Sequence, residues 1–431
     1  MNRRILDLAI PNIISNITIP LLGMVDLALM GHLEDKAYIG AVALGGMIFN
    51  FIYWGFSFLR MGTSGFTAQA YGKRDLAETV MILTRALLVA ATGSLILIIL
   101  QYPIAHLSFI IIDGSRQVQL LAREYFHIRI MAAPATIGLY ALTGWFLGMQ
   151  NARIPMIITI LVNMMNIGFS FILIKIFHMK ADGVALGTVL AQYSGLLIAI
   201  WFLFKYYKKI FRYWQREKLP DKKALTLFFT VNKDIFIRTL FLILILSFFT
   251  TQSARTNDTI LAVNTLLMQF FMLFSFFVDG YAHAAEALSG RYTGAKNRIN
   301  LIKTIRLLFL WGGAIAIVFT VIYLAAGRYL LFILTNNQEI INAARPYLPW
   351  VILIPVITFP AFIWDGIYIG ATASAAMRNS MLISALLVFL PAYYLLEPVF
   401  GNHGLWLAFI IFMASRGITL TLMAGKSVLT V

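Results

Sequence analysis

The chain has 431 residues, of which 60% are hydrophobic and only 12% are charged, and it contains no cysteine. Ordinary soluble domains carry about 25% charged residues, so this composition excludes a large soluble fold and indicates an integral membrane protein. The lack of cysteine excludes disulfides and thiolate metal sites. A net charge of +16 would suit a nucleic-acid partner, but the cations gather in short loops between apolar runs, which is typical of orientation in a membrane.

Twelve apolar segments follow one another, each long enough for the ~20 residues that a membrane-spanning helix needs. Arg3 and Arg4 precede the first, but no small-residue cleavage site follows, so we expect a retained helix rather than a signal peptide. The segments lie at 5–31, 38–71, 76–103, 117–149, 154–177, 183–208, 233–255, 259–291, 300–333, 342–376, 379–398 and 402–426. We expect two six-helix lobes, at 1–208 and 233–431, joined by a basic cytoplasmic linker at 209–232.

Lysine and arginine are concentrated in the loops after every second segment. These loops hold Lys73 and Arg74, then Arg153, then the linker, then residues 291–303, and finally Arg378. The alternate loops have few cations, and acids offset them. The positive-inside rule therefore predicts that both termini are cytoplasmic in a protein of the plasma membrane.

The two halves of the chain repeat polar landmarks. Gly144 and Gly148 match Gly366 and Gly370, 222 residues later. Because each half has an even number of segments, both halves enter the membrane in the same orientation. Their pseudo-two-fold axis then runs along the membrane normal, and a cavity at their interface is the natural place for a substrate.

Ionisable side chains occur inside several apolar segments, where an acid costs at least ~2.5 kcal/mol and is usually functional. They are Asp26, Arg60, Arg238, Asp279, Glu286 and Asp365. Asp279, His283 and Glu286 fall at i, i+4 and i+7, on one face of a helix. We expect this face to line a cavity or to meet a cation. The alternative is a structural ion pair between Arg238 and one of the two acids on this face.

The first segment combines Asp26 with two prolines. Pro11 and Pro20 each remove a backbone hydrogen bond, which favours a helix that bends, with a static kink as the alternative. Position alone leaves Asp26 either inside the membrane or among the headgroups at the helix end.

Amides and hydroxyls mark the fifth and sixth segments. Asn163, Asn166 and Ser170 lie on the fifth and Thr188 on the sixth. Hydrogen bonds between helices are a common use of such residues; a cation or proton site shared with Asp26 is the functional interpretation.

The sequence offers little for an enzyme. The six histidines lack metal-ligand spacing, and the Gly425-Lys426-Ser427 tripeptide has no first glycine of a phosphate loop before it. We therefore expect no cofactor, no resident metal and no nucleic-acid partner.

Several longer motifs resemble the multidrug and toxic compound extrusion (MATE) transporters, in their DinF-like branch, over essentially the whole chain. They lie at 9–33 (AIPNIISNITIPLLGMVDLALMGHL), 60–75, 144–155, 182–189, 279–295 and 364–381. The resemblance implies an all-α membrane protein of twelve helices, in two pseudo-symmetric six-helix lobes forming a V around a central cavity. It also implies an antiporter that exports organic, often cationic, compounds against inward H+ or Na+ flow.

In DinF-like relatives an ion site is built from a first-helix Asp, an Asn and an Asp on helix five, and a Thr on helix six. Those positions match Asp26, Asn166, Ser170 and Thr188 here. The serine leaves one formal negative charge where two are usual, and a dehydrated Na+ is then less well compensated. We therefore expect protonation of Asp26 to drive substrate release, with Na+ at Asp26, Asn166 and Thr188 as the alternative.

A cavity for flat organic cations gains from aromatic and methionine side chains. Candidates are Met24, Met30, Met61 and Phe66. The main rival is a lipid-linked oligosaccharide flippase of the same superfamily, for which Arg60, Arg238 and Arg255 would hold a pyrophosphate. No dimerisation motif is visible, so we expect a monomer.

Overall fold

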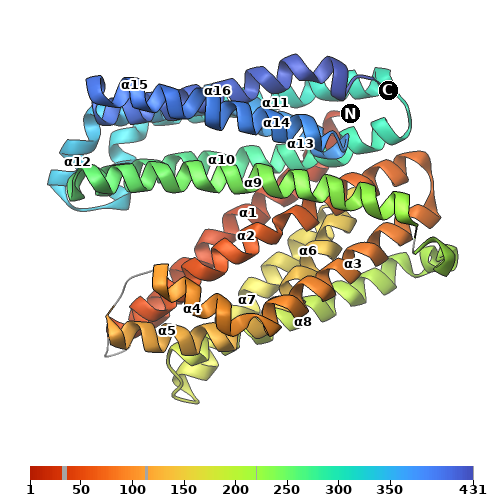
Figure 1. Ribbon diagram of the computed structural model, residues 1–431, viewed down its shortest axis with the longest axis horizontal. Coiled ribbons are helices and arrows are strands. Elements are labelled where there is room, and N and C mark those ends of the chain that lie inside the picture. Colours follow the sequence, from red (N-terminus) through yellow and green to blue (C-terminus); the bar gives the residue numbers. More distant parts are fainter. Residues whose placement is uncertain (32–35, 112–114, 220, 431) are drawn as a thin grey trace. The chain divides into compact units, whose positions relative to one another are not determined.

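The computed structural model describes residues 1–31, 36–111, 115–219 and 221–430, and within them it leaves out the side chains of 19, 21–22, 24–31, 36 and 111. Every regular element in this part of the chain is helical (Figure 1). The first half contains α1 (Asn2–Gly31), α2 (Lys36–Lys73), α3 (Leu76–Ile99), α4 (Gln101–Ile111), α5 (Arg116–Arg129), α6 (Ala133–Gly148), α7 (Arg153–Lys175) and α8 (Ala181–Tyr207). The second contains α9 (Lys222–Thr256), α10 (Asp258–Gly294), α11 (Arg298–Leu334), α12 (Gln338–Ala344), α13 (Leu348–Gly370), α14 (Ser374–Leu382), α15 (Leu390–Phe400) and α16 (Asn402–Ser427).

Eleven helices of the described residues are long and apolar enough to cross a membrane. Two of them contain a short 3-10 stretch ahead of a proline. In the span Arg116–Gly148 the stretch is η1 (Ile130–Ala132), before Pro134, and in Gln338–Gly370 it is η4 (Arg345–Tyr347), before Pro349. Proline lacks a backbone N–H, which suits it to the start of the next helical stretch.

The contacts divide the chain into two compact units. One contains Met1–Ile13 with Phe229–Val431, and the other contains Ile14–Phe228. The start of α1 thus packs with the second half of the chain, although the sequence predicted a first lobe of 1–208. Gly280 on α10 explains this packing, because a Cβ there would lie under 3.0 Å from the carbonyl of Ala9. The other division falls within the expected linker, where α9 has already begun at Lys222.

In each unit a pair of helices approaches backbone to backbone at equivalent glycines. A Cβ on Gly144 of α6 would lie under 3.0 Å from the Arg60 carbonyl of α2, and a Cβ on Gly366 of α13 would do the same at the Ala282 carbonyl of α10. Small residues permit such close packing of membrane helices. The two contacts are related by the same step of 222 residues that relates the glycines in the sequence.

The turns repeat at this spacing too. Arg74, after α2, and Lys296, after α10, both have positive φ, and so do Gln150, after α6, and Thr372, after α13. A left-handed residue directly after a helix is a common way to end it. The backbone therefore repeats even where the side chains have diverged.

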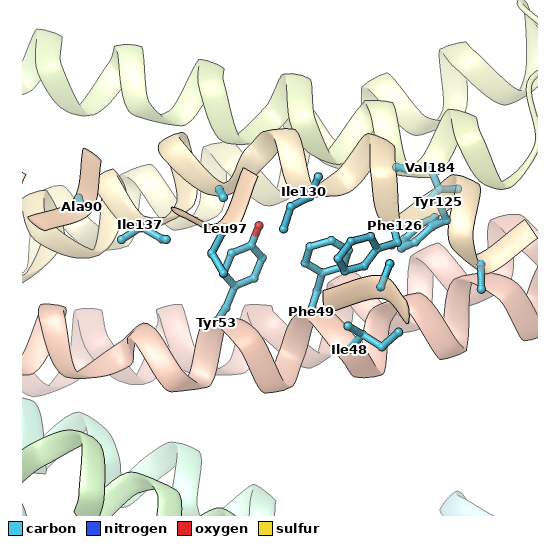
Figure 2. Close-up of a cluster of buried hydrophobic side chains, with 14 of the residues drawn as sticks. Ile48, Phe49, Tyr53, Ala90, Leu97, Tyr125, Phe126, Ile130, Ile137 and Val184 are labelled. Atoms are coloured by element: carbon cyan, nitrogen blue, oxygen red, sulfur yellow. The ribbon is translucent and has the colours of Figure 1, made fainter. Parts of the chain in front are cut away.

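The core of the unit Ile14–Phe228 is rich in aromatic rings (Figure 2). Phe49 stacks on Tyr53 at 5.6 Å and on Phe126 at 5.1 Å between ring centroids. The Arg129 guanidinium lies 5.0 Å from the Phe49 ring centre, where the ring's negative face attracts it. These contacts fix α2 against α5.

Candidate functional site

A buried polar cluster joins α7 to α8. The Asn166 amide donates to the Thr188 hydroxyl at 2.9 Å, and this hydroxyl donates to the Val184 carbonyl at 2.9 Å. Both Asn166 and Thr188 are buried. The fold therefore brings the candidate residues of the fifth and sixth segments into direct contact.

Ser170 lies one turn beyond Asn166, against Gly187 of α8. A Cβ on Gly187 would lie 2.6 Å from the Ser170 Oγ, so a glycine is needed there. Ser170 Oγ and Asn166 Oδ1 are buried and make no hydrogen bond to the part of the chain that the structure describes. Leaving such a group unsatisfied costs about 1–3 kcal/mol, so the two oxygens are suited to receive a proton-bearing group or a cation.

Asn163 contacts α1 instead of this cluster. Its amide donates to the Thr18 carbonyl at 3.2 Å. Asp26 lies on the same helix α1, but its side chain is outside the described residues, and the same is true of Met24 and Met30. The structure thus connects α1 to α7 without describing the acid itself.

Helix α1 continues through both of its prolines. The division between the two compact units, after Ile13, falls between Pro11 and Pro20. Asn12 donates its side-chain amide to the Leu8 carbonyl at 2.7 Å, one turn earlier. The segment in which both prolines lie is therefore also the one where α1 passes from one unit to the other.

A second polar centre lies in the other unit, where two arginines share one carboxylate oxygen. Arg238 of α9 and Arg416 of α16 both bind Oδ2 of Asp365 on α13, the latter at 2.6 Å. All three residues are less than 9% exposed. Such a triad is held by the attraction of opposite charges in a low-dielectric surrounding.

The sequence suggested neither Asp365 as the partner of Arg238 nor any part for Arg416. The available signal was an arginine in the middle of the apolar run 402–426, where a cation needs a partner. The sequence does not single out Arg85 of α3 either. This arginine is 3% exposed, pairs with Glu78 at 2.7 Å and donates to the Lys218 carbonyl at 2.9 Å.

The same face of α9 carries a further buried ion pair. Asp234, one turn before Arg238, accepts from Arg378 Nη1 at 2.5 Å and from the Ser374 hydroxyl at 3.0 Å. Ser374 and Arg378 belong to the first turns of α14. Ion pairs in successive turns therefore connect α9 to α13 and α14, and the shared Asp365 connects α13 to α16.

The acidic face expected on α10 packs against α13. Glu286 is buried, and its carbonyl lies against Gly370, at a distance that only a glycine permits. Asp279 and His283 are half-buried, and Asp279 acts electrostatically on Arg416. The structure thus places Asp279 near the Arg238–Asp365–Arg416 triad.

The remaining candidates lie in the unit Ile14–Phe228. Arg60 is half-buried on α2, and its backbone carbonyl contacts Gly144. Phe66 stacks on Phe228 with 5.6 Å between ring centroids. Among the residues that the structure describes, no three histidine, aspartate or glutamate side chains gather in a way that would hold a metal ion.

Comparison with known proteins decides the family. A sequence model described as MatE matches residues 11–172 and 235–394, which is most of the chain. The chain belongs to the MatE family.

Relatives of this MatE chain include the DNA damage-inducible protein F of Escherichia coli (strain K12), which is 38% identical over 96% of the chain and 90% of the relative. The multidrug export protein MepA of Staphylococcus aureus (strain bovine RF122 / ET3-1) is 20% identical over 95% of the chain and 90% of its own length.

Solved structures share the fold. A MATE protein in its bent conformation superposes with a TM-score of 0.89 at 19% identity, over 99% of this MatE chain and 95% of that one. An outward-facing MATE transporter gives 0.85 at 19% identity, with the same coverage. The resemblance to MATE transporters and the all-helical membrane fold are therefore confirmed.

Proposed function

We propose that this protein is a secondary active exporter of organic, often cationic, compounds, driven by protons that enter through a site at Asp26. The export role is supported by family membership and by a relative whose name describes multidrug export. In this proposal the protein works as a monomer in the plasma membrane, with both termini on the cytoplasmic side and without a cofactor.

The observation that carries the ion site is the pair of unsatisfied oxygens on α7. Asn166 Oδ1 and Ser170 Oγ are buried beside Thr188 without a described partner. A membrane interior penalises such oxygens, so a ligand that satisfies them would bind favourably.

Helix geometry supports Asp26 as the group that completes this site. By the expected topology α1 and α7 are the first and fifth crossings, so they run in the same direction. They meet where Asn163 binds the Thr18 carbonyl. Eight residues further along each helix is about 12 Å, which brings the backbone of Asp26 to the level of the turn after Ser170.

The chemistry of these residues favours H+ over Na+. The site would contain one carboxylate, two amide or hydroxyl groups from Asn166 and Thr188, and the hydroxyl of Ser170. A dehydrated Na+ would be less well compensated here than in a site with two carboxylates, whereas a proton on Asp26 neutralises the carboxylate without needing further ligands. Each proton that moves across ~100 mV supplies about 2.3 kcal/mol, enough for more than tenfold accumulation of a neutral substrate.

The proposed cycle follows from this neutralisation. Ionised Asp26 attracts a cationic substrate; when a proton binds from outside, the attraction is lost and the substrate leaves. The site with its neutral acid then turns back through the membrane interior at lower cost, and the proton leaves to the cytoplasm. The prolines of α1 allow this helix to bend as its acid changes charge.

The test is transport by the full chain in proteoliposomes, with an ethidium-like cation as substrate. A pH gradient alone should drive transport and a Na+ gradient alone should not. Asp26→Asn should abolish both export and the accompanying proton movement. If the Asn variant exports normally, or if only Na+ drives the wild type, proton coupling at Asp26 is wrong.

The flippase alternative depends on arginines that are free to hold a pyrophosphate. Arg238 already binds Asp365, and Arg255 is exposed near the end of α9. The pairing of Arg238 therefore favours the exporter, whereas the exposed Arg255 does not distinguish the two functions.

A further inference from the structure

The segment after α8 is folded against its own unit. Residues 205–218, which we name the basic collar, comprise the end of α8, then η2 (Lys208–Tyr213) and η3 (Arg216–Lys218). They hold six cations and a single acid, Glu217. The six cations are all exposed: Lys205, Lys208, Lys209, Arg212, Arg216 and Lys218.

Buried contacts hold the basic collar against the rest of its unit. Arg85, itself 3% exposed, donates to the Lys218 carbonyl at 2.9 Å. Ile210 is buried in a hydrophobic cluster of the unit, and Phe211 stacks on Phe204 at 5.6 Å between centroids. If the collar were only a solvated linker, its backbone carbonyls would bind water, and no buried arginine would be needed to satisfy them.

The outer surface of the basic collar combines cations with amphipathic rings. Tyr206, Tyr213 and Trp214 are about half exposed. Lys205 lies 4.2 Å from the ring centre of Trp201, which is also half exposed. Tryptophan and tyrosine are enriched where the bilayer meets water, and most of the collar forms the end of Ala181–Tyr213, a helical span long and apolar enough to cross a membrane.

We propose that the basic collar binds the headgroups of anionic phospholipids. Its cations lie at the end of a membrane helix and just beyond it, the arrangement that attracts acidic lipids. The rings insert at the headgroup level, and the lysines and arginines meet the phosphates. A soluble polyanion would not explain the exposed rings, so the lipid surface is the partner that the whole collar fits.

The lack of cysteine makes a single-label experiment possible. Gln215→Cys, in the exposed turn between η2 and η3, carries an environment-sensitive fluorophore in the full chain, reconstituted into nanodiscs. We expect its emission to shift to shorter wavelength as phosphatidylglycerol replaces phosphatidylcholine. Raised salt should reverse the shift, because exposed charges are screened.

The decisive variant removes three collar cations in the labelled chain, as Lys208→Gln, Lys209→Gln and Arg212→Gln together. It should bind phosphatidylglycerol about 100-fold more weakly, so that most of the shift is lost. The matched control, Arg116→Gln with Arg123→Gln and Lys175→Gln, removes three exposed cations of α5 and α7 and should respond as the parent does.

Three results would overturn the proposal: no shift with phosphatidylglycerol, an equal loss in both triple variants, or the same shift on adding soluble glycerol phosphate. Tryptic cleavage in the basic collar of the unlabelled parent chain gives a second reading. Phosphatidylglycerol should slow it, and an unchanged rate would contradict lipid binding even if the labelled protein folds poorly.

Discussion

Arg416 of α16 donates to Oδ2 of Asp365 on α13 at 2.6 Å, and both side chains are almost completely buried. Because Arg238 binds the same oxygen, one carboxylate is held between two guanidiniums. Removing the acid would leave two buried like charges, whereas removing one arginine would leave a pair. Replacing Asp365 should therefore destabilise the protein more than replacing one of the two arginines.

Asp365→Asn should lower the free energy of unfolding by about 3–5 kcal/mol, because it removes the negative charge that both arginines bind. Arg416→Met should cost less, since Arg238 still compensates the acid. Thermal unfolding of the detergent-solubilised protein measures both. Glu124→Gln, at an exposed acid of α5, should leave the midpoint unchanged. Equal midpoints for the Asp365 and Glu124 variants would show that the triad adds no stability.

Gly366→Ala should force α10 and α13 apart, because the new Cβ would lie under 3.0 Å from the backbone carbonyl of Ala282. Overpacking of this kind costs about 1–3 kcal/mol or more. Gly313→Ala, on α11, is the matched control, since its Cβ would find its nearest neighbour at 3.7 Å. That control should be neutral or stabilising by up to ~1 kcal/mol, from helix propensity. Similar unfolding midpoints for the two variants would contradict the close packing.

Ser170→Asp should give the proposed ion site a second carboxylate. We expect a Na+ gradient alone to drive export by this variant but not by the wild type, because two charges compensate a dehydrated cation better than one. Ser170→Asn, of nearly equal volume but neutral, controls for size beside Gly187. If Na+ drives both variants, or neither, the charge at this position does not select the coupling ion.

Arg85→Met should release the basic collar, because the Lys218 carbonyl loses its buried donor. Trypsin should then cleave within residues 205–218 faster than in the parent chain. Arg116→Met removes an exposed arginine and should leave the rate unchanged. A parental rate in the Arg85 variant would mean that Ile210 and Phe211 hold the collar without it.

Much of the architecture could be predicted from the sequence alone. Apolar runs of membrane-spanning length leave few alternatives to helices, because a bilayer offers no partners for backbone N–H and C=O groups. Gly144 and Gly366 indicated the internal repeat through their spacing, and the structure places both at close contacts between helices. Asn166 and Thr188 were named together by their place in the family pattern, and the structure bonds them directly.

Long-range partners were a different matter. Asp365 and Arg416 are 51 residues apart, on helices whose rotation relative to each other no local sequence pattern encodes. For the same reason, the sequence predicts a partner for Arg238 on α10, whereas the structure places that partner on α13. The assignment of the first thirteen residues to the second unit likewise depends on a glycine at 280 that admits α1.

Sequence by itself determined the membrane class, the helical segments, the internal repeat and the family, because hydropathy and spacing are properties of the chain in one dimension. Tertiary structure alone decided which charges meet, which buried oxygens lack a partner among the described residues, and that the linker is held by Arg85. Those outcomes depend on how helices rotate and approach, which is fixed only when the packed interior excludes water and every buried charge must find its counterpart.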